Sequence, residues 1–126
     1  MKRLLLSAAA AATLLTAAPA MAHPKLVSAS PSANATVARP SRLQLTYSEK
    51  LIPALSGIAL TMTAMPGMKS HAPMKVSGFA TSVARDGKTL VIALPRPLPA
   101  GTYQVKWHAV AGDTHRITGA YSFQVK

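Results

Sequence analysis

The chain has 126 residues, no cysteine and a formal charge of +11, because 14 Lys and Arg face only 3 Asp and Glu. The absence of cysteine excludes disulfides and thiolate ligands, so packing alone must stabilise the fold and a soft-metal site must use methionine. Basic residues occur singly and aromatic residues make up only 5% of the chain, which argues against a nucleic-acid-binding protein. The charge is instead suited to anionic membrane surfaces or acidic partners.

The first predicted element is a secretory signal peptide over residues 1–22. It has two basic residues at its start, a short apolar stretch, and a small-residue cleavage site at Ala20-Met21-Ala22. The apolar stretch is too short for a membrane-spanning helix, and no later segment is long enough either. We therefore expect an exported periplasmic protein of residues 23–126 that does not span a membrane and carries a formal charge of +9.

The remaining 104 residues are predicted to form one all-β domain, a Greek-key β-barrel or sandwich. Apolar and polar residues alternate over 42–47, 103–108 and 120–126, large and smaller apolar residues alternate over 90–94, and no long helical period occurs. Asp86-Gly87 predicts a hairpin between residues 79–83 and 89–94. Three prolines predict a stiff connection over residues 95–100, with Gly101 opening the next strand.

Two stretches interrupt the strand pattern, residues 62–74 and residues 111–116. Both contain the side chains with metal-binding chemistry. Functional residues are often placed on loops that a rigid β scaffold holds in position.

A first candidate site combines the new amino terminus with residues 113–115. After cleavage, His23 offers an α-amine and an imidazole that together can chelate one cation, and Pro24 behind it has no amide hydrogen to lose. Asp113 and His115 are two apart, so an extended segment would point both to the same side. Nitrogen and oxygen donors suit a tetragonal Cu(II) centre, although zinc and nickel accept similar ligands.

Glu49 is a further candidate, because the hairpin turn already explains Asp86 and a cation site in a basic domain needs local negative charge. The plainer alternative treats all these residues as structural. His23 then only marks the cleavage point, Asp113 forms a turn, His115 lies on the surface and Glu49 ends a strand. His108, on the solvent face opposite Trp107, is interpreted as structural.

The second candidate site is a methionine-rich segment. It contains all four methionines of the mature chain together with one histidine: Met62, Met65, Met68, His71 and Met74. Pro66 and Gly67 interrupt any helical stripe, which favours a loop. Thioethers select Cu(I), so a Cu(I) site is one interpretation, and an adaptable methionine surface for a partner protein is the other.

Taken together, these motifs resemble the CopC/PcoC family of periplasmic copper-resistance proteins over essentially the whole mature chain. The matching segments are residues 23–27, 47–51, 62–68, Trp107 with 112–115, and 117–119. The resemblance implies a cupredoxin-like or immunoglobulin-like Greek-key β fold in a monomeric copper carrier that is not an enzyme. It also implies Cu(II) at His23, Asp113 and His115 with Glu49 nearby, and Cu(I) at the methionines and His71.

Lys69 departs from the family pattern as one extra residue, which bears on the role of His71. The resemblance further implies a multicopper oxidase or an inner-membrane copper transporter as partner. Two other functions remain open from the residues alone. One is a copper mono-oxygenase that uses the terminal histidine chelate, and the other is a metal-free partner-binding β domain.

Overall fold

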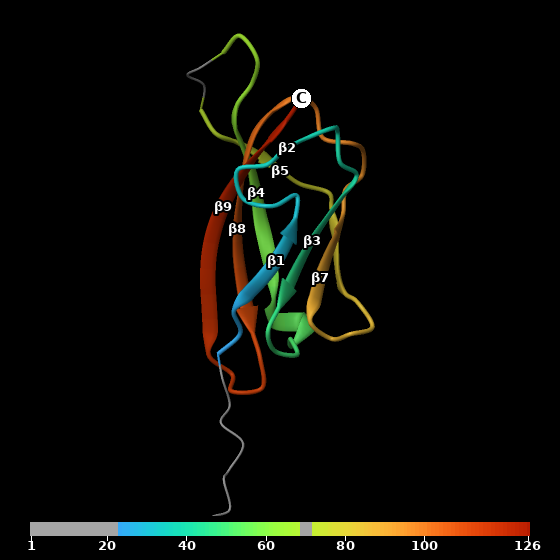
Figure 1. Ribbon diagram of the computed structural model, residues 1–126, viewed down its shortest axis with the longest axis vertical. Helices are drawn as coiled ribbons and strands as arrows, with labels where there is room; N and C mark the ends of the chain where they lie inside the picture. Colours follow the sequence, from blue (N-terminus) through green and yellow to red (C-terminus); the bar gives the residue numbers. More distant parts are fainter. Residues whose placement is uncertain (1–22, 69–71) are drawn as a thin grey trace, which may run out of the picture.

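The structure is a computed structural model that describes residues 23–68 and 72–126. These residues form two packed β-sheets (Figure 1). One sheet has the order β1 (Leu26–Ser30), β3 (Arg42–Tyr47), β7 (Thr89–Ala93) and β6 (Ala80–Val83). The other has the order β2 (Thr36–Val37), β9 (Arg116–Val125), β8 (Gly101–Val110), β4 (Gly57–Ala64) and β5 (Met74–Val76). The predicted all-β sandwich is confirmed.

Strand pairing is antiparallel except between β2 and β9, which run parallel. The chain crosses from one sheet to the other after β1, β2, β3, β5 and β7, as expected for a Greek-key connectivity. A short 3-10 helix, η1 (Pro53–Leu55), precedes β4. In the part of the chain that the structure describes, no helix is long and apolar enough to cross a membrane.

The alternating residues predicted to face inward do form the core between the sheets. The core includes leucines and an isoleucine from β3 and β7, and aromatic residues from β8 and β9 that pack against them. Its largest fully buried side chains include Tyr47, Tyr103 and Phe123. Tyr103 and Phe123 stack with ring centroids 5.6 Å apart, and Tyr47 meets Trp107 edge-on at 5.2 Å. Period-2 alternation therefore predicted the buried face correctly.

The predicted hairpin joins β6 to β7. Of its two turn residues only Gly87 has a positive φ, of 72°. Asp86 acts differently, because its carboxylate accepts hydrogen bonds from the backbone amides of Lys88 and Thr89 at 2.8 and 3.0 Å. It also accepts the Thr89 hydroxyl at 2.7 Å. These bonds lower the pKa of Asp86 and give the backbone amides of the turn their hydrogen-bond acceptors.

The last strand begins at Arg116, four residues before its predicted start. The additional part of the strand contains Gly119, and glycine is uncommon within strands. Gly119 pairs with Trp107, and a Cβ at Gly119 would overlap the indole ring. Glycine here makes room for the tryptophan rather than breaking the strand.

The two metal-binding candidates lie at opposite ends of the sandwich (Figure 1). Strands β8 and β9 pair from Gly101–Val125 at one end to Val110–Arg116 at the other, so the turn between them projects beyond the second end. The segment between β4 and β5 projects beyond the first end.

Candidate metal centre

The residues at one end of the sandwich converge on a single point. One nitrogen from each of His23 and His115 and one carboxylate oxygen of Asp113 all lie within 4.8 Å of one another. His23 Nδ1 is 2.6 Å from Asp113 Oδ2, and His115 Nδ1 is 3.6 Å from the same oxygen. The two imidazole rings meet edge-on with centroids 5.1 Å apart. Separations of this size fit donors that share one cation at about 2 Å from each.

Backbone contacts hold His23 beside the β8–β9 turn. Pro24, the next residue, is fully buried. Lys25 donates its amide to the Ser48 hydroxyl at 2.9 Å, and the Ser48 amide donates back to the Lys25 carbonyl at 2.9 Å. The burial and the paired hydrogen bonds anchor the segment before β1 to the end of β3. Sequence reasoning did not single out Ser48, and its place in the Tyr-Ser-Glu motif was the available signal.

The turn that carries Asp113 and His115 is not extended, contrary to the sequence expectation. The Thr114 amide donates to the Ala111 carbonyl at 2.9 Å, and Thr114 has a positive φ of 65°. Asp113 Oδ1 accepts the His115 amide at 3.1 Å. The two side chains converge because the left-handed residue folds the chain back, and not because of strand alternation. Few β-branched residues adopt this conformation, so Thr114 is a second positioning residue that sequence reasoning missed.

The Asp113 carboxylate is the sheltered member of the cluster. Its side chain is 9% exposed, against 55% for His23 and 72% for His115. Its burial opposes ionisation, but the hydrogen bond from the His115 amide and the adjacent imidazoles outweigh this effect and lower the pKa of Asp113. Oδ2 is buried and meets a donor only when an imidazole Nδ1 carries a proton. A metal cation can replace that proton.

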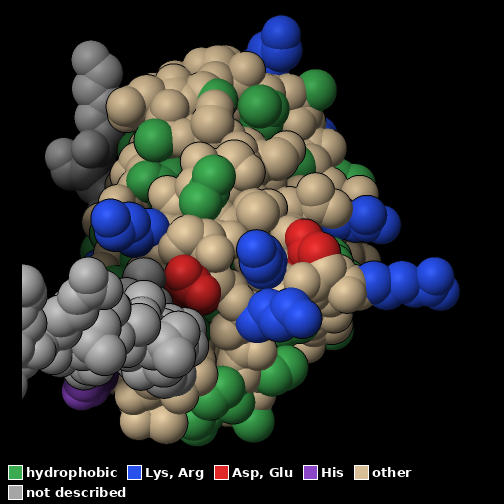
Figure 2. Space-filling model, turned by 60° about the horizontal axis from the view of Figure 1, so that its bottom comes forward, with side chains coloured by type: hydrophobic (Ala, Val, Ile, Leu, Met, Phe, Trp, Pro, Cys, Tyr) green, Lys and Arg blue, Asp and Glu red, His purple; other side chains and the backbone are tan. Residues whose placement is uncertain are grey.

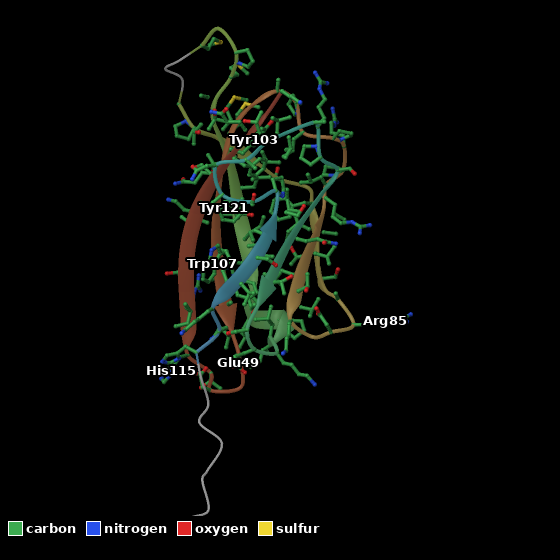
Figure 3. The ribbon with its side chains drawn as sticks, viewed as in Figure 1. Glu49, Arg85, Tyr103, Trp107, His115 and Tyr121 are labelled. Atoms are coloured by element: carbon green, nitrogen blue, oxygen red, sulfur yellow. The ribbon has the colours of Figure 1, made fainter. Side chains whose placement is uncertain are left out.

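Glu49 lies at the same end as His115 but outside the converging donor atoms (Figure 3). It lines a neighbouring depression of about 570 Å³ together with Asp113, Lys50 and Lys88. Glu49 thus adds negative charge near the cluster, and its role as a direct ligand stays a prediction. His108 is half-buried on β8 and does not belong to the cluster, as expected.

The methionine segment is less of a loop than the sequence suggested. Met62 belongs to β4 and is only 6% exposed, whereas Met74 opens β5 and is 52% exposed. The two are cross-strand neighbours and line one depression of about 340 Å³. Met65 and Met68 form a second facing pair, closed by a hydrogen bond from the Met68 amide to the Met65 carbonyl at 3.0 Å.

Four thioethers are therefore gathered at one end of the sandwich as two facing pairs, and not on one open loop. Met65 is half-buried and Met68 is 51% exposed. His71 and Lys69 lie outside the described residues. Residues directly opposite each other on paired strands have Cβ atoms about 5 Å apart, a separation that lets two side chains reach a common ligand.

On the face that Figure 2 shows, the charge is spread rather than concentrated. Figure 2 shows Lys and Arg side chains scattered singly, with acidic side chains among them.

Comparison with known proteins assigns the chain to a family. The profile of the CopC domain matches residues 26–126. Copper resistance protein C of Xanthomonas campestris pv. juglandis is 50% identical over 115 residues, covering 91% of this chain and 89% of that protein. Copper resistance protein C of Escherichia coli is 53% identical over 107 residues, covering 85% of this chain and 84% of that protein.

Solved structures agree with the fold. The crystal structure of PcoC, described as a methionine-rich copper resistance protein from Escherichia coli, superposes with a TM-score of 0.76 at 50% identity. The match covers 83% of this chain and all of PcoC. CopC from Methylosinus trichosporium OB3b superposes with a TM-score of 0.64 at 29% identity, covering 82% of this chain and 94% of that one. The matching profile and these relatives agree with the two-sheet β-sandwich and its histidine–carboxylate cluster. The chain therefore belongs to the CopC family of copper-binding proteins, which are not enzymes.

Proposed function

We propose that this protein is a periplasmic copper carrier that begins at His23 after removal of residues 1–22 and binds Cu(II) through His23, Asp113 and His115. The observation that carries the proposal is the convergence of donors from two segments some 90 residues apart on one buried carboxylate oxygen. Two imidazoles, an α-amine and a carboxylate form the mixed nitrogen and oxygen set that Cu(II) accepts. The copper is cargo, so an exposed site suits loading and release.

The same proposal assigns Cu(I) to the methionine end. Met62 and Met74 face each other, Met65 and Met68 do likewise, and thioethers are soft ligands without a charge to neutralise. His71 completes this set as a prediction. Reduction of the ion would then favour the opposite end of the molecule, and transfer would involve another periplasmic or membrane copper protein.

The Cu(II) assignment is tested by titrating metal-free protein that begins at His23 against a competing chelator. Asp113→Asn keeps the acceptor for the His115 amide but removes the charge, and we expect it to weaken Cu(II) binding by at least about 100-fold. Glu49→Gln is the matched control, with an expected loss below about tenfold. Equal losses in both variants would contradict the assignment of Asp113 as the central carboxylate.

The Cu(I) assignment is tested under anaerobic conditions with a Cu(I) chelator. Replacing Met65, Met68 and Met74 by leucine leaves the buried Met62 in place, so that the fold is kept. We expect Cu(I) binding to be lost and Cu(II) binding to be retained. Unchanged Cu(I) affinity would refute the methionine site and leave the Cu(II) site standing. Failure of the unsubstituted protein to bind either ion would instead favour the metal-free partner-binding alternative.

A further inference from the structure

The outer face of the five-stranded sheet carries a depression that neither copper site uses. It has a volume of about 630 Å³ and lies over β4, β8 and β9. Its lining residues are Ile58, Ala59, Lys106, Trp107, His108, Arg116, Thr118, Gly119 and Ala120. We call this depression the β4–β8–β9 trough. It is open because Ala59 and Ala120, which flank Lys106 in the sheet, present only a methyl group each.

The charged groups of the trough are all basic. Lys106 and Arg116 are exposed, and none of the three acidic residues of the mature chain lines the trough. Among the described residues, the recorded salt bridges are those of His23 and His115 with Asp113, so neither Lys106 nor Arg116 has a carboxylate partner. Two fixed positive charges thus border an uncovered concave surface.

His108 forms the polar floor between these cations. Its ring lies against Gly57, where a Cβ would be 3.4 Å from the ring carbon Cε1. Burial and then the charge of Arg116 lower the pKa of His108, so the ring is neutral at pH 7. A neutral imidazole offers one hydrogen-bond donor and one acceptor to whatever occupies the trough.

The trough reaches the end of the sandwich that carries the histidine cluster. Arg116 directly follows His115, and Figure 3 shows Trp107 midway along the sheet with His115 at its lower end. A partner seated in the trough would therefore lie beside the His23–Asp113–His115 cluster.

We propose that the β4–β8–β9 trough is a docking site for an acidic segment of a partner protein. Lys106 and Arg116 supply the complementary charge, and the small residues between them let carboxylate side chains approach the sheet. A basic domain of charge +9 would also steer such a partner over long range. A membrane fits less well, because surface attachment uses clusters of four to eight basic residues, and the trough supplies two.

The proposal does not depend on copper, so the test uses metal-free protein of residues 23–126. The probe is a capped ten-residue peptide of alternating Glu and Gly, and a peptide of alternating Gln and Gly is its neutral control. Amide chemical shifts of ¹⁵N-labelled protein are followed at low and high salt. We expect the Glu peptide to shift amides of β4, β8 and β9 at low salt only, and the Gln peptide to shift none.

The decisive variant is the double substitution Lys106→Gln/Arg116→Gln. Its matched control, Arg42→Gln/Arg85→Gln, removes the same charge from exposed positions elsewhere (Arg85 is labelled in Figure 3). The first variant should weaken peptide binding about fivefold or more, and the control should stay within about twofold. All four residues are exposed, so both variants should keep the native spectrum.

Two results would overturn the proposal. One is an equal loss of peptide binding in both double variants, which would make the attraction a property of net charge alone. The other is binding to vesicles of 70% phosphatidylcholine and 30% phosphatidylglycerol that Lys106→Gln/Arg116→Gln abolishes while peptide binding is unaffected. That result would make the trough a membrane contact.

Discussion

The two ends of this sandwich bring their candidate metal-binding side chains together in different ways. At the histidine end, a buried proline, the paired hydrogen bonds between Lys25 and Ser48, and a left-handed turn bring the donors together. At the methionine end, one thioether is packed in the core, another opens a strand, and the rest lie on a short turn. The contrast is between donors that converge on one carboxylate oxygen and thioethers that are spread over two strands and a turn.

The largest expected difference between the ends is their response to pH. Cu(II) must displace protons from imidazole and amine donors, whereas thioethers carry no proton to displace. Burial alone would raise the pKa of Asp113, but the hydrogen bond from the His115 amide and the adjacent imidazoles lower it. The carboxylate therefore stays ionised above pH 5 and contributes nothing to the loss of Cu(II) affinity.

Cu(II) affinity should therefore fall at least about 1,000-fold between pH 7 and pH 5, whereas affinity at the thioethers should change little. Competition titrations with each copper state across this range measure both. If the affinities for Cu(II) and Cu(I) fell equally with pH, the proposal that the two ions use different ligands would be contradicted.

A pair of histidine variants sharpens the assignment of the first end. His115→Ala removes an exposed residue of the proposed ligand set and should weaken Cu(II) binding by more than about 100-fold with the fold intact. His108→Ala removes a histidine from the same strand pair but outside the cluster, and should leave Cu(II) affinity within about twofold. The two variants can be compared by chelator competition. A large loss in His108→Ala would mean that the ligand set is wrong.

A pair of methionine variants separates packing from binding at the other end. Met62 is 6% exposed, so Met62→Ala should lower the free energy of unfolding by at least about 2 kcal/mol. Its cross-strand partner Met74 is 52% exposed, and Met74→Ala should cost less than about 1 kcal/mol. Denaturant unfolding followed by the fluorescence of Trp107, the single tryptophan, measures both. Similar costs for the two variants would contradict the core position of Met62.

The smallest effect concerns the turn that presents Asp113 and His115. Thr114 has a φ of 65°, which asparagine tolerates better than a β-branched residue. Thr114→Asn should raise the free energy of unfolding by about 0.5–1 kcal/mol and leave Cu(II) affinity within about twofold. Thr118→Asn makes the same change on extended strand and should give no gain. Stabilisation by both or by neither would show that the left-handed conformation is not the cause.

The sequence predicted the fold well because alternation reports burial directly. Leu43, Leu45 and Tyr47 were assigned to the core by period alone, and all three are buried. The prediction was wrong in detail where a residue type is compatible with either a strand or a loop. The last strand was predicted to begin at Ala120 but already includes Gly119, which makes room for Trp107, and Met62 was assigned to a loop but is packed in a strand.

Candidate ligands were also found from sequence, but the reason for their convergence was not. Asp113 and His115 were placed together by assuming an extended segment, and a left-handed turn brings them together instead. No local pattern states the backbone angle of Thr114, and none pairs Lys25 with Ser48 across the fold. The β4–β8–β9 trough was likewise invisible, because its small residues and its cations come from three separate strands.

The most direct test compares two forms of the protein, one beginning at His23 and one carrying an additional methionine before it. Each is loaded with one equivalent of Cu(II) and studied by electron paramagnetic resonance and chelator competition. If the α-amine and imidazole of His23 act together, the extended form should change its spectrum and bind at least about tenfold more weakly. Identical spectra and affinities would contradict the terminal chelate, and with it the proposed Cu(II) site.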